Sequence, residues 1–404
     1  MADRADRQDG ADRQDGADRQ DGAASRTLAV RLDSDGDVLL TGPALRALAA
    51  VDPSGTVDLL ASPQGAAAAA LLPGVADVLT FAAPWSGFEP PAVDAVAVTG
   101  LVDRLRARGY ARAVMFTSFH QSPLPMALLA RLAGIAWVGA TSVDYPGSLL
   151  DLRHRRGVAA DGGDLHEAAA ALELAVAAGG RLPAGDDGRL AVRPPESLAS
   201  TATAATPVPA PATAPAPSTA AVTGSGRPYV VLHPGASVPS RAMDEARAGR
   251  TVRALAEDGW VVAVTGGPGE TALTARVTGT ARRAVDLGGR TDLAGLAALL
   301  AGAACVVVGN TGPAHLAAAV GTPVVSLFSP VVPARRWAPT GVPSVVLGDQ
   351  TAACRDTRAR QCPVPGHPCL AGVDESEVVD AVRRLTTTGT VPGHGTAVGG
   401  VARR

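Results

Sequence analysis

An acidic side chain follows the first predicted strand, at the start of the first predicted helix. The strand covers residues 28–32, and the sequence DSDGD then leads into an apolar helical pattern. Gly36 permits a tight turn. Asp37 could cap the helix by accepting backbone N–H groups, or it could point into a cleft and act as a general base. This segment alone leaves both interpretations open, and we interpret Asp33 and Asp35 as turn residues.

A second candidate segment follows a predicted strand at residues 229–232 and reads HPGASVPSR, beginning at His233. Gly235 and Ser237 are small enough to let backbone N–H groups approach an anion closely. Arg241 lies within reach of the same anion and can grip a phosphate with two parallel hydrogen bonds. The alternative is an ordinary turn followed by a solvated arginine, and the loop alone does not decide between them.

The sequence GNTGPAHLA, after a predicted strand at residues 305–308, carries the most specific signal in the chain. The loop changes to a helix near Gly312, so free N–H groups at the helix start can face a diphosphate. We expect Asn310 and Thr311 to act as short polar caps. His315 falls on the first helical turn, where its ring could donate a hydrogen bond to a phosphate oxygen.

A fourth loop, TGGPGE, lies just beyond a predicted strand at residues 260–265. Gly267 admits a ligand close to the backbone, and Glu270 could accept hydrogen bonds from ribose hydroxyls, as acidic side chains do in other nucleotide sites. Pro268 excludes the dinucleotide-binding pattern G-x-G-x-x-G. The other interpretation is a plain strand-to-helix turn with a glutamate in its first helical turn.

These loops need strands that end side by side, and the sequence alternates short β-branched runs with longer Ala- and Leu-rich stretches. The alternation predicts βα units and a parallel sheet in each half, which is an α/β fold. Ligands of such sheets bind outside the carboxyl ends of the strands, where the four loops lie. The predicted strands are 28–32, 57–60, 113–116, 229–232, 260–265, 305–308 and 324–328, and the predicted helices in the first half are 38–50, 93–108 and 124–133.

Composition narrows the range of partners. The chain has 404 residues, 47% of them hydrophobic, which is enough for two domains with separate cores. A net charge of -2 offers no general basic surface, so we expect no nucleic-acid partner. All 36 basic residues are arginine, so an anion site must use guanidinium groups, histidine or backbone N–H groups. Because the sequence shows neither a membrane-spanning run nor a signal peptide, we expect a cytoplasmic protein.

Low-complexity segments divide the chain. Residues 1–26 contain the sequence ADRQDG three times, which predicts a disordered tail. The Pro/Ala/Thr-rich residues 194–227 predict an interdomain linker, and residues 386–404 predict a disordered C-terminal tail. The predicted domains are therefore residues 27–193 and residues 228–385.

Four cysteines are too few for a disulfide scaffold in a chain of this length. Cys354, Cys362 and Cys369, together with His367, could close a tetrahedral metal site. Their spacings are wider than the Cys-x-x-Cys pairs of most zinc sites, so we favour packed free thiols.

Taken together, the four segments resemble glycosyltransferase family 9, the heptosyltransferase family. They read VRLDSDGDVLLTGPALRAL near the start, and VVLHPGASVPSR, VTGGPGE and VVVGNTGPAHLAAAVGTPVVSLFSP in the second half. The resemblance covers residues 28–385. It implies a GT-B fold, in which two Rossmann-like domains face each other across a cleft. The first domain would hold an acceptor, and the second would hold ADP-heptose or a related nucleotide-sugar.

The resemblance also implies roles for single residues. Asp37 would deprotonate the acceptor hydroxyl, Arg241 would face the diphosphate, and Glu270 would face the ribose. His120 and Gln121 would lie on the acceptor side. The family loop often reads Asp-Thr-Gly, whereas this chain has Asn in the first of these positions and so lacks an acidic group there. The other implied donor-binding positions are His233, Gly235, Ser237, Gly267, Asn310, Thr311, Gly312 and His315.

Such a protein would transfer a heptose-like sugar with inversion from an ADP-sugar or related nucleotide-sugar to a hydroxyl of a cell-surface glycan, a lipopolysaccharide-type acceptor or a small molecule. Arg241 and backbone N–H groups would stabilise the charge that grows on the leaving diphosphate, with no cofactor and no divalent metal. A membrane-bound acceptor would bring the protein to the inner face of the cell membrane. Two alternatives are a sugar-nucleotide epimerase of the same fold, which needs no acceptor, and a non-catalytic nucleotide-sugar-binding protein.

Overall fold

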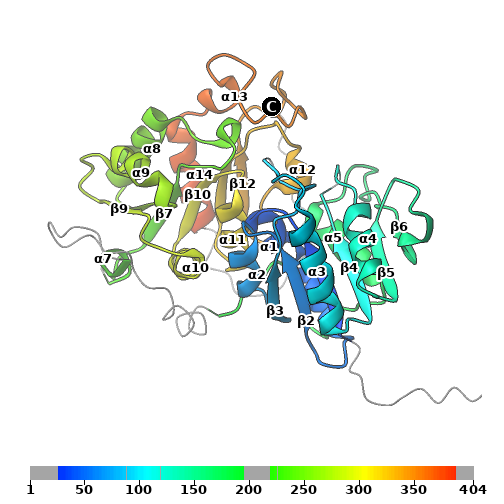
Figure 1. Ribbon diagram of the computed structural model, residues 1–404. Helices are drawn as coiled ribbons and strands as arrows, with labels where there is room; N and C mark the ends of the chain where they lie inside the picture. Colours follow the sequence, from blue (N-terminus) through cyan, green and yellow to red (C-terminus); the bar gives the residue numbers. More distant parts are fainter. Residues whose placement is uncertain (1–25, 88, 119, 195–218, 225, 388–404) are drawn as a thin grey trace, which may run out of the picture.

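The computed structural model describes residues 26–87, 89–118, 120–194, 219–224 and 226–387, which form two α/β domains (Figure 1). Each domain has one sheet of six parallel strands, in the order β3-β2-β1-β4-β5-β6 in the first and β12-β11-β10-β7-β8-β9 in the second. The two orders are equivalent, because each sheet grows outward in both directions from its first strand. This is the doubly wound, Rossmann-like arrangement, so the predicted fold class is confirmed.

In the first domain, helices cover both faces of the sheet. Alternate residues of a strand point to opposite faces, so Ala29 packs on the side of α1, α2 and α5, whereas Leu28 and Val30 pack on the side of α3 and α4. The strands are β1 Thr27–Arg31, β2 Val57–Ala61, β3 Val75–Thr80, β4 Arg112–Phe116, β5 Trp137–Thr141 and β6 Leu152–His154. The helices are α1 Asp35–Ala49, α2 Ala66–Leu71, α3 Ala95–Arg108, α4 Leu124–Leu132, η1 Gly147–Leu149 and α5 Glu167–Ala177.

The second domain repeats this plan. Val231 packs on the side of α10 and α11, and Val230 and Leu232 pack on the side of α8 and α14. The strands are β7 Tyr229–His233, β8 Val261–Gly266, β9 Ala284–Gly288, β10 Cys305–Gly309, β11 Val324–Leu327 and β12 Ser344–Leu347. The helices are η3 Pro239–Arg241, α8 Glu245–Glu257, η4 Pro268–Glu270, α9 Thr271–Thr278, α10 Leu293–Ala301, α11 Gly312–Ala319, α12 Ala334–Trp337, α13 Pro368–Ala371 and α14 Glu375–Thr387.

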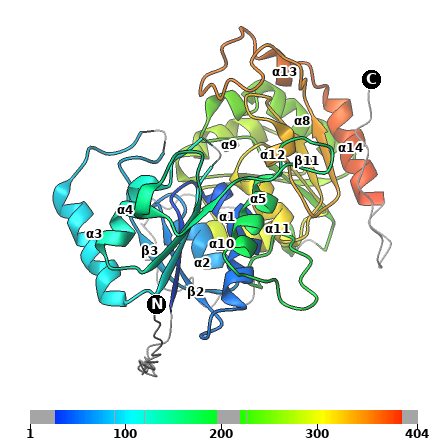
Figure 2. The same ribbon diagram turned by 90° about the vertical axis from the view of Figure 1, so that its right-hand side faces the viewer.

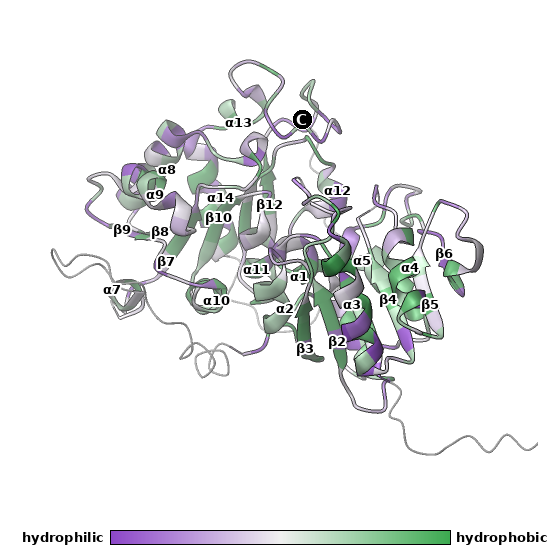
Figure 3. Ribbon diagram, in the orientation of Figure 1, coloured by the Kyte–Doolittle hydropathy of each residue, from purple (hydrophilic) through white to green (hydrophobic). Residues whose placement is uncertain are grey.

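All seven predicted strands and the three predicted helices are present, with ends that differ by up to three residues. Central strands such as β7 and β10 are buried along their whole length and are green in Figure 3, which is why apolar runs reveal them. The unpredicted strands β3, β6, β9 and β12 are the four sheet edges, and each contains half-buried or exposed residues. The unpredicted inner strand β5 contains Gly139, which weakens its strand pattern.

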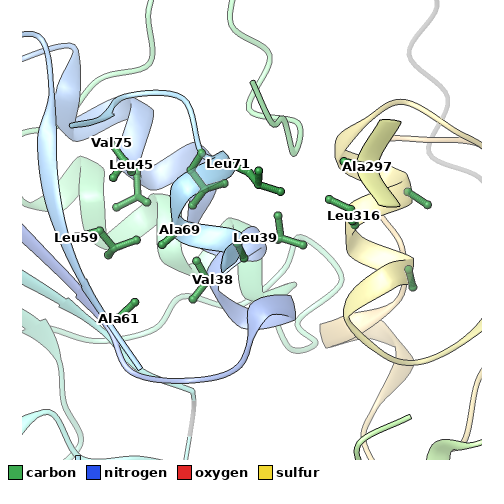
Figure 4. Close-up of a cluster of buried hydrophobic side chains, with 14 of the residues drawn as sticks. Val38, Leu39, Leu45, Leu59, Ala61, Ala69, Leu71, Val75, Ala297 and Leu316 are labelled. Atoms are coloured by element: carbon green, nitrogen blue, oxygen red, sulfur yellow. The ribbon is translucent and has the colours of Figure 1, made fainter. Parts of the chain in front are cut away.

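The two domains meet through helices that lie on the inner faces of the sheets. In both ribbon views α1 and α2 of the first domain lie next to α10 and α11 of the second (Figures 1 and 2). Their side chains form one hydrophobic cluster, in which Leu39 of α1 lies on the side that faces Ala297 of α10 and Leu316 of α11 (Figure 4). The carboxyl ends of the two sheets are therefore held opposite each other.

Two predicted boundaries need correction. Residues 219–223 of the predicted linker form helix α7, and Val222 is 0% exposed in the hydrophobic cluster, so this end of the segment contributes to the core. Arg26, assigned to the N-terminal tail, pairs with Asp58 at 2.7 Å. The predictions for residues 1–25, 195–218 and 388–404 lie outside the described residues.

Within the described ranges, the structure contains no helix that is both long and apolar enough to cross a membrane.

Candidate functional site

The amino ends of α1 and α11 approach each other across the domain boundary. A Cβ atom built on Gly36, in the first turn of α1, would lie 3.2 Å from Cδ2 of His315 and 3.3 Å from the Cα of Gly312. Glycine at this position therefore permits the close approach. Because the first N–H groups of a helix have no partner within the helix and carry partial positive charge, the two helix ends together favour an anion.

Asp37 lies at this convergence, and the helix-cap interpretation of it is wrong. The residue at the N-cap position of α1 is Ser34, and Asp37 follows three residues later. The Asp37 carboxylate accepts hydrogen bonds from Arg31 Nη2 and from Ser34 Oγ, both at 3.1 Å, and its side chain is 21% exposed. A side chain held in this way, with part of its surface in solvent, can receive a proton from a bound hydroxyl.

The interpretation of Asp33 and Asp35 as turn residues is incomplete. Asp35 begins α1, and its carboxylate accepts the backbone N–H of Ala68 at 3.0 Å. The Asp33 carboxylate forms an ion pair with Arg31 Nε at 2.8 Å, and burial raises its pKa to about 6. The available signal was the charged pair at positions 31 and 33, two residues apart in an otherwise apolar strand.

The two predicted acceptor-side residues follow β4 and differ in surroundings. Gln121 donates from Nε2 to Asp33 Oδ1 at 2.6 Å, so it belongs to the same group of side chains as Asp37. His120 is exposed at the edge of this group. Partial desolvation, with the nearby Arg358 adding to it, lowers the pKa of His120 to about 4, so its ring is neutral at pH 7.

Arg241 projects from the second domain toward Asp37. Its Nε atom is buried and has no hydrogen-bond partner among the described residues. Burial lowers the pKa of Arg241, the charge of Asp37 raises it, and the neighbouring charge of Arg358 lowers it. Two guanidinium groups thus lie close together on this side of the boundary, as a diphosphate site requires. Arg358 was missed because it lies in the cysteine-containing segment, far from any glycine-rich loop.

His315 lies on the first turn of α11 and is buried, and its Nδ1 atom has no hydrogen-bond partner in the part of the chain that is described. Burial lowers the pKa of this ring to about 4, so it is neutral at pH 7. A neutral imidazole carries its proton on one ring nitrogen, so the Nδ1 atom of His315 could donate or accept a hydrogen bond.

The expectation that Asn310 and Thr311 cap α11 with their side chains is wrong. Thr311 holds the N-cap position, but its side chain makes no capping hydrogen bond. Asn310 is 6% exposed and pairs with the backbone of Ser329 in both directions: its Nδ2 donates to the carbonyl oxygen, and its Oδ1 accepts from the N–H, both at 3.2 Å. Asn310 therefore joins the loop after β10 to the loop after β11.

A second group of predicted donor-site residues surrounds Glu270. Its Oε2 accepts the N–H of Gly267 at 2.7 Å, and a Cβ atom on Gly235 would lie 1.9 Å from its Oε1, so a larger residue there would displace the Glu270 carboxylate. His233 lies beneath, with Nδ1 3.1 Å from Thr265 Oγ1 and Nε2 4.0 Å from Glu270 Oε2. Ser237 is exposed on the same loop. A carboxylate fixed in this way can accept hydrogen bonds from vicinal hydroxyls.

Charged contacts beside the site hold the two domains together. Glu167, at the start of α5, is buried and accepts hydrogen bonds from Arg156 of its own domain and from Arg336 of the second domain at 3.3 Å. Arg336 also pairs with Asp164 at 2.6 Å. The Nε2 atom of His166 lies 2.9 Å from the carbonyl oxygen of Ala338. These contacts keep Asp37 opposite Arg241 and His315.

The cysteines are explained by packing, and Cys369 Sγ lies 4.0 Å from Ser329 Oγ. All four are free thiols, and Cys354 and Cys369 are buried in the core of the second domain. Among the described residues, no three His, Cys, Asp or Glu side chains are grouped so that they could hold a metal ion.

Residues 104–367 match the family model described as glycosyltransferase family 9 (heptosyltransferase). The chain belongs to glycosyltransferase family 9. Arg241, Glu270 and His315 lie inside the matched segment of this family 9 protein, and Asp37 precedes it. Over 109 residues the chain is 36% identical to lipopolysaccharide heptosyltransferase 1 of Pseudomonas aeruginosa, a match that spans 27% of this chain and 30% of that protein.

Solved structures of family 9 proteins share the fold. The Escherichia coli ADP-heptose lps heptosyltransferase II superimposes with a TM-score of 0.66 at 17% identity, covering 91% of this chain and 100% of that one. The E. coli heptosyltransferase WaaC, solved with ADP-2-deoxy-2-fluoro heptose, gives a TM-score of 0.63 at 20% identity and covers 89% and 99% of the two chains. Both similarities extend over the two domains, in agreement with the predicted GT-B architecture.

Proposed function

We propose that this family 9 protein is an inverting glycosyltransferase that moves a heptose-like sugar from an ADP-sugar to a hydroxyl group of an acceptor. One observation carries the proposal: the charge of Asp37, on the first domain, acts on Arg241 and His315 of the second domain, where the amino ends of α1 and α11 converge. A base from one domain and an anion site from the other are the two parts that such a transfer needs.

The proposed reaction is a single displacement. The acceptor oxygen forms a bond to the anomeric carbon while the bond from that carbon to the donor phosphate oxygen breaks, and the electron pair leaves with ADP. Asp37 takes the proton of the attacking hydroxyl. Negative charge grows on the diphosphate in the transition state, where Arg241, the His315 N–H and the first N–H groups of α11 stabilise it without having to reorganise.

Donor binding belongs to the second domain in this proposal. Glu270 accepts hydrogen bonds from the ribose, with His233, Gly235 and Gly267 shaping its position, and Thr311 and Gly312 present the end of α11 to the diphosphate. Ser237 completes the loop around the same nucleotide, and Asn310 supports it through Ser329. That WaaC was solved with an ADP-heptose analogue supports ADP-heptose as the first donor to test.

We place the acceptor on the first domain, beside His120 and Gln121. A cell-surface glycan, a lipopolysaccharide-type molecule or a small molecule would each fit the proposal, and a membrane-bound acceptor would bring the protein to the inner face of the membrane from the cytoplasm. The reaction as proposed uses guanidinium, imidazole and backbone N–H groups in place of a divalent metal, and it needs no cofactor.

The asparagine at position 310 is not an argument for a non-catalytic protein. The two hydrogen bonds to Ser329 give Asn310 a reason of its own, because an ionised aspartate could make only one of them.

A donor and acceptor screen tests the proposal. Purified protein is first challenged with ADP-heptose and other nucleotide-sugars in a thermal-shift assay, because a ligand that binds only the native state raises the melting temperature. Sugar transfer to an acceptor panel is then followed by mass spectrometry. We expect stabilisation by ADP-sugars and transfer with inversion. Donor isomerisation without any acceptor, or donor binding without turnover across the whole panel, would reject the transferase.

A further inference from the structure

Five polar side chains, including the proposed base, meet where β1 and β4 end. They are Arg31, Asp33, Asp37, Ser118 and Gln121. Arg31 lies at the centre and is only 3% exposed. Its Nη2 donates to Asp37 Oδ1 at 3.1 Å and to Ser118 Oγ at 3.0 Å. Its Nε lies 2.8 Å from Asp33 Oδ2, an ion pair without the alignment of a hydrogen bond. A single guanidinium group thus holds two carboxylates that lie four residues apart.

Asp33 is fixed from two further directions. Its Oδ1 accepts Gln121 Nε2 at 2.6 Å, and Gln121 Oε1 in turn accepts the backbone N–H of Ser118 at 3.2 Å. The backbone carbonyl of Asp33 accepts Ser62 Oγ at 2.6 Å. These bonds tie the loop after β4 to the end of β1, so Arg31 has little freedom to turn away from either carboxylate.

Neutralisation of Arg31 does not explain the second carboxylate. One carboxylate is enough to compensate a buried guanidinium group, and a further buried charge adds a desolvation cost of its own. Asp33 is 9% exposed and carries that cost, whereas Asp37 is 21% exposed toward the domain boundary. The buried carboxylate and the exposed one are linked through the arginine that they share.

We infer that Arg31 and Asp33 are positioning residues for Asp37: Arg31 orients one oxygen of the base, and Asp33, by binding the other side of the same guanidinium group, keeps Arg31 from neutralising that base. This inference rests on the proposed function, because it assigns a purpose to the surroundings of Asp37 in sugar transfer. When both carboxylates are ionised, Asp37 shares Arg31 and remains a competent proton acceptor. When Asp33 is protonated, Asp37 receives more of the charge of Arg31 and becomes a weaker proton acceptor.

Several other charged groups face this cluster. Glu167 of α5 faces the cluster from the first domain. Its carboxylate pairs with Arg156 of the same domain and with Arg336 of the second domain. His120 faces the cluster from the first domain, and Arg241, Arg358 and His315 face it from the second. Burial raises the pKa of Asp33 to about 6, and the bond from Gln121 opposes that rise. Protonation of Asp33 therefore falls in a range where turnover can be measured.

The test compares pH–rate profiles of Asp33→Asn and Gln121→Leu with the unaltered protein. The readout is ADP release from ADP-heptose, with water in place of the acceptor. Asp33→Asn removes the opposing negative charge permanently, so we expect the plateau rate to fall by about three- to ten-fold and the acid limb to move to lower pH by about one unit. Gln121→Leu removes a bond that favours ionised Asp33, so the acid limb should move the opposite way, to higher pH.

Two measurements distinguish a failure of this inference from a failure of the proposed function. Thermal unfolding shows whether each variant folds. A carbon-13 titration of the aspartate carboxyl groups should show a group with a midpoint near pH 6 that disappears in Asp33→Asn, whether or not the protein turns over. If ADP is released and Asp37→Asn abolishes it, but both acid limbs stay where they are, the inference is wrong and the proposed function stands. If Asp37→Asn leaves ADP release unchanged, the base assignment fails and the inference fails with it.

Discussion

Replacing Asn310 by aspartate should destabilise the second domain, although it makes the loop more like the common family pattern. Asn310 is 6% exposed, and its amide makes two hydrogen bonds of 3.2 Å with the backbone of Ser329. An ionised aspartate keeps the bond to the N–H but places a second oxygen against the carbonyl oxygen, where a donor stood. Leaving a buried acceptor without its partner costs about 1–3 kcal/mol.

The loss should depend on pH, and its sign follows from linkage. The carboxyl group introduced at position 310 can donate to the carbonyl of Ser329 only when it is protonated. Folding therefore favours the protonated form and raises the pKa of this group above its unfolded value of ~3.9. Below the unfolded pKa, the Asn310→Asp variant should be nearly as stable as the parent protein. This stability is lost as the pH rises through the folded pKa of the introduced carboxyl group.

Thermal and urea unfolding at pH 4 and pH 8 measure this difference. At pH 8 the expected loss lowers the melting temperature by roughly 2–4 °C per kcal/mol for a domain of this size. Asn310→Ala is the matched control, because it removes both bonds without adding a charge and so should cost about the same at both pH values. A variant Asn310→Asp that is as stable as the parent at pH 8, or whose loss does not change with pH, would refute the assigned role of this amide.

Four further outcomes are expected. Asp37→Asn should lower transfer by roughly 10² to 10⁴ while calorimetry shows unchanged donor affinity, and near-normal transfer would remove Asp37 as the base. Arg241→Ala should weaken donor binding in the same calorimetric assay and slow transfer as well, and wild-type affinity would contradict its contact with the diphosphate. Transfer should continue in excess EDTA, whereas complete loss restored by one divalent ion would overturn the metal-free proposal. Gly36→Ala places a methyl group 3.2 Å from His315 and should reduce transfer and donor affinity, while Gly100→Ala, which meets nothing within 4 Å, should not.

Sequence reasoning reached the fold because the central strands are uninterrupted apolar runs. Strands such as β7 and β10 contribute to both faces of a parallel sheet and so carry a signal that needs no knowledge of the partner strands. The carboxyl ends of β1, β7 and β10 then locate the loops that carry Asp37, Arg241 and His315, respectively. Edge strands such as β3 and β12 lack this signal, because part of their side chains lies in solvent and they form no continuous buried run.

The contacts that sequence reasoning missed are long-range pairings. Asn310 looks like a helix cap when only its neighbours along the chain are known, yet its partner Ser329 follows a different strand. Asp33 looks like a turn residue until β4 brings Gln121 to it from 88 positions away. Val222 sits in a Pro- and Ala-rich stretch whose composition favours a linker, and its burial depends on the packing of the second domain. Composition and local spacing contain none of these pairings.

The charge at the domain boundary predicts that a bound donor stabilises the contact between the two domains. The amino ends of α1 and α11 lie against each other, and Arg241 and Arg358 add two positive charges beside them, whereas Asp37 supplies one negative charge. Bringing these groups together is opposed by repulsion between the cations and between the two helix ends. A bound diphosphate carries the negative charge that compensates them, so a bound donor should stabilise this arrangement of the two domains. Ligands shift a conformational equilibrium by this kind of differential affinity, and we therefore expect ADP-sugar to favour the arrangement in which Asp37 faces the donor site.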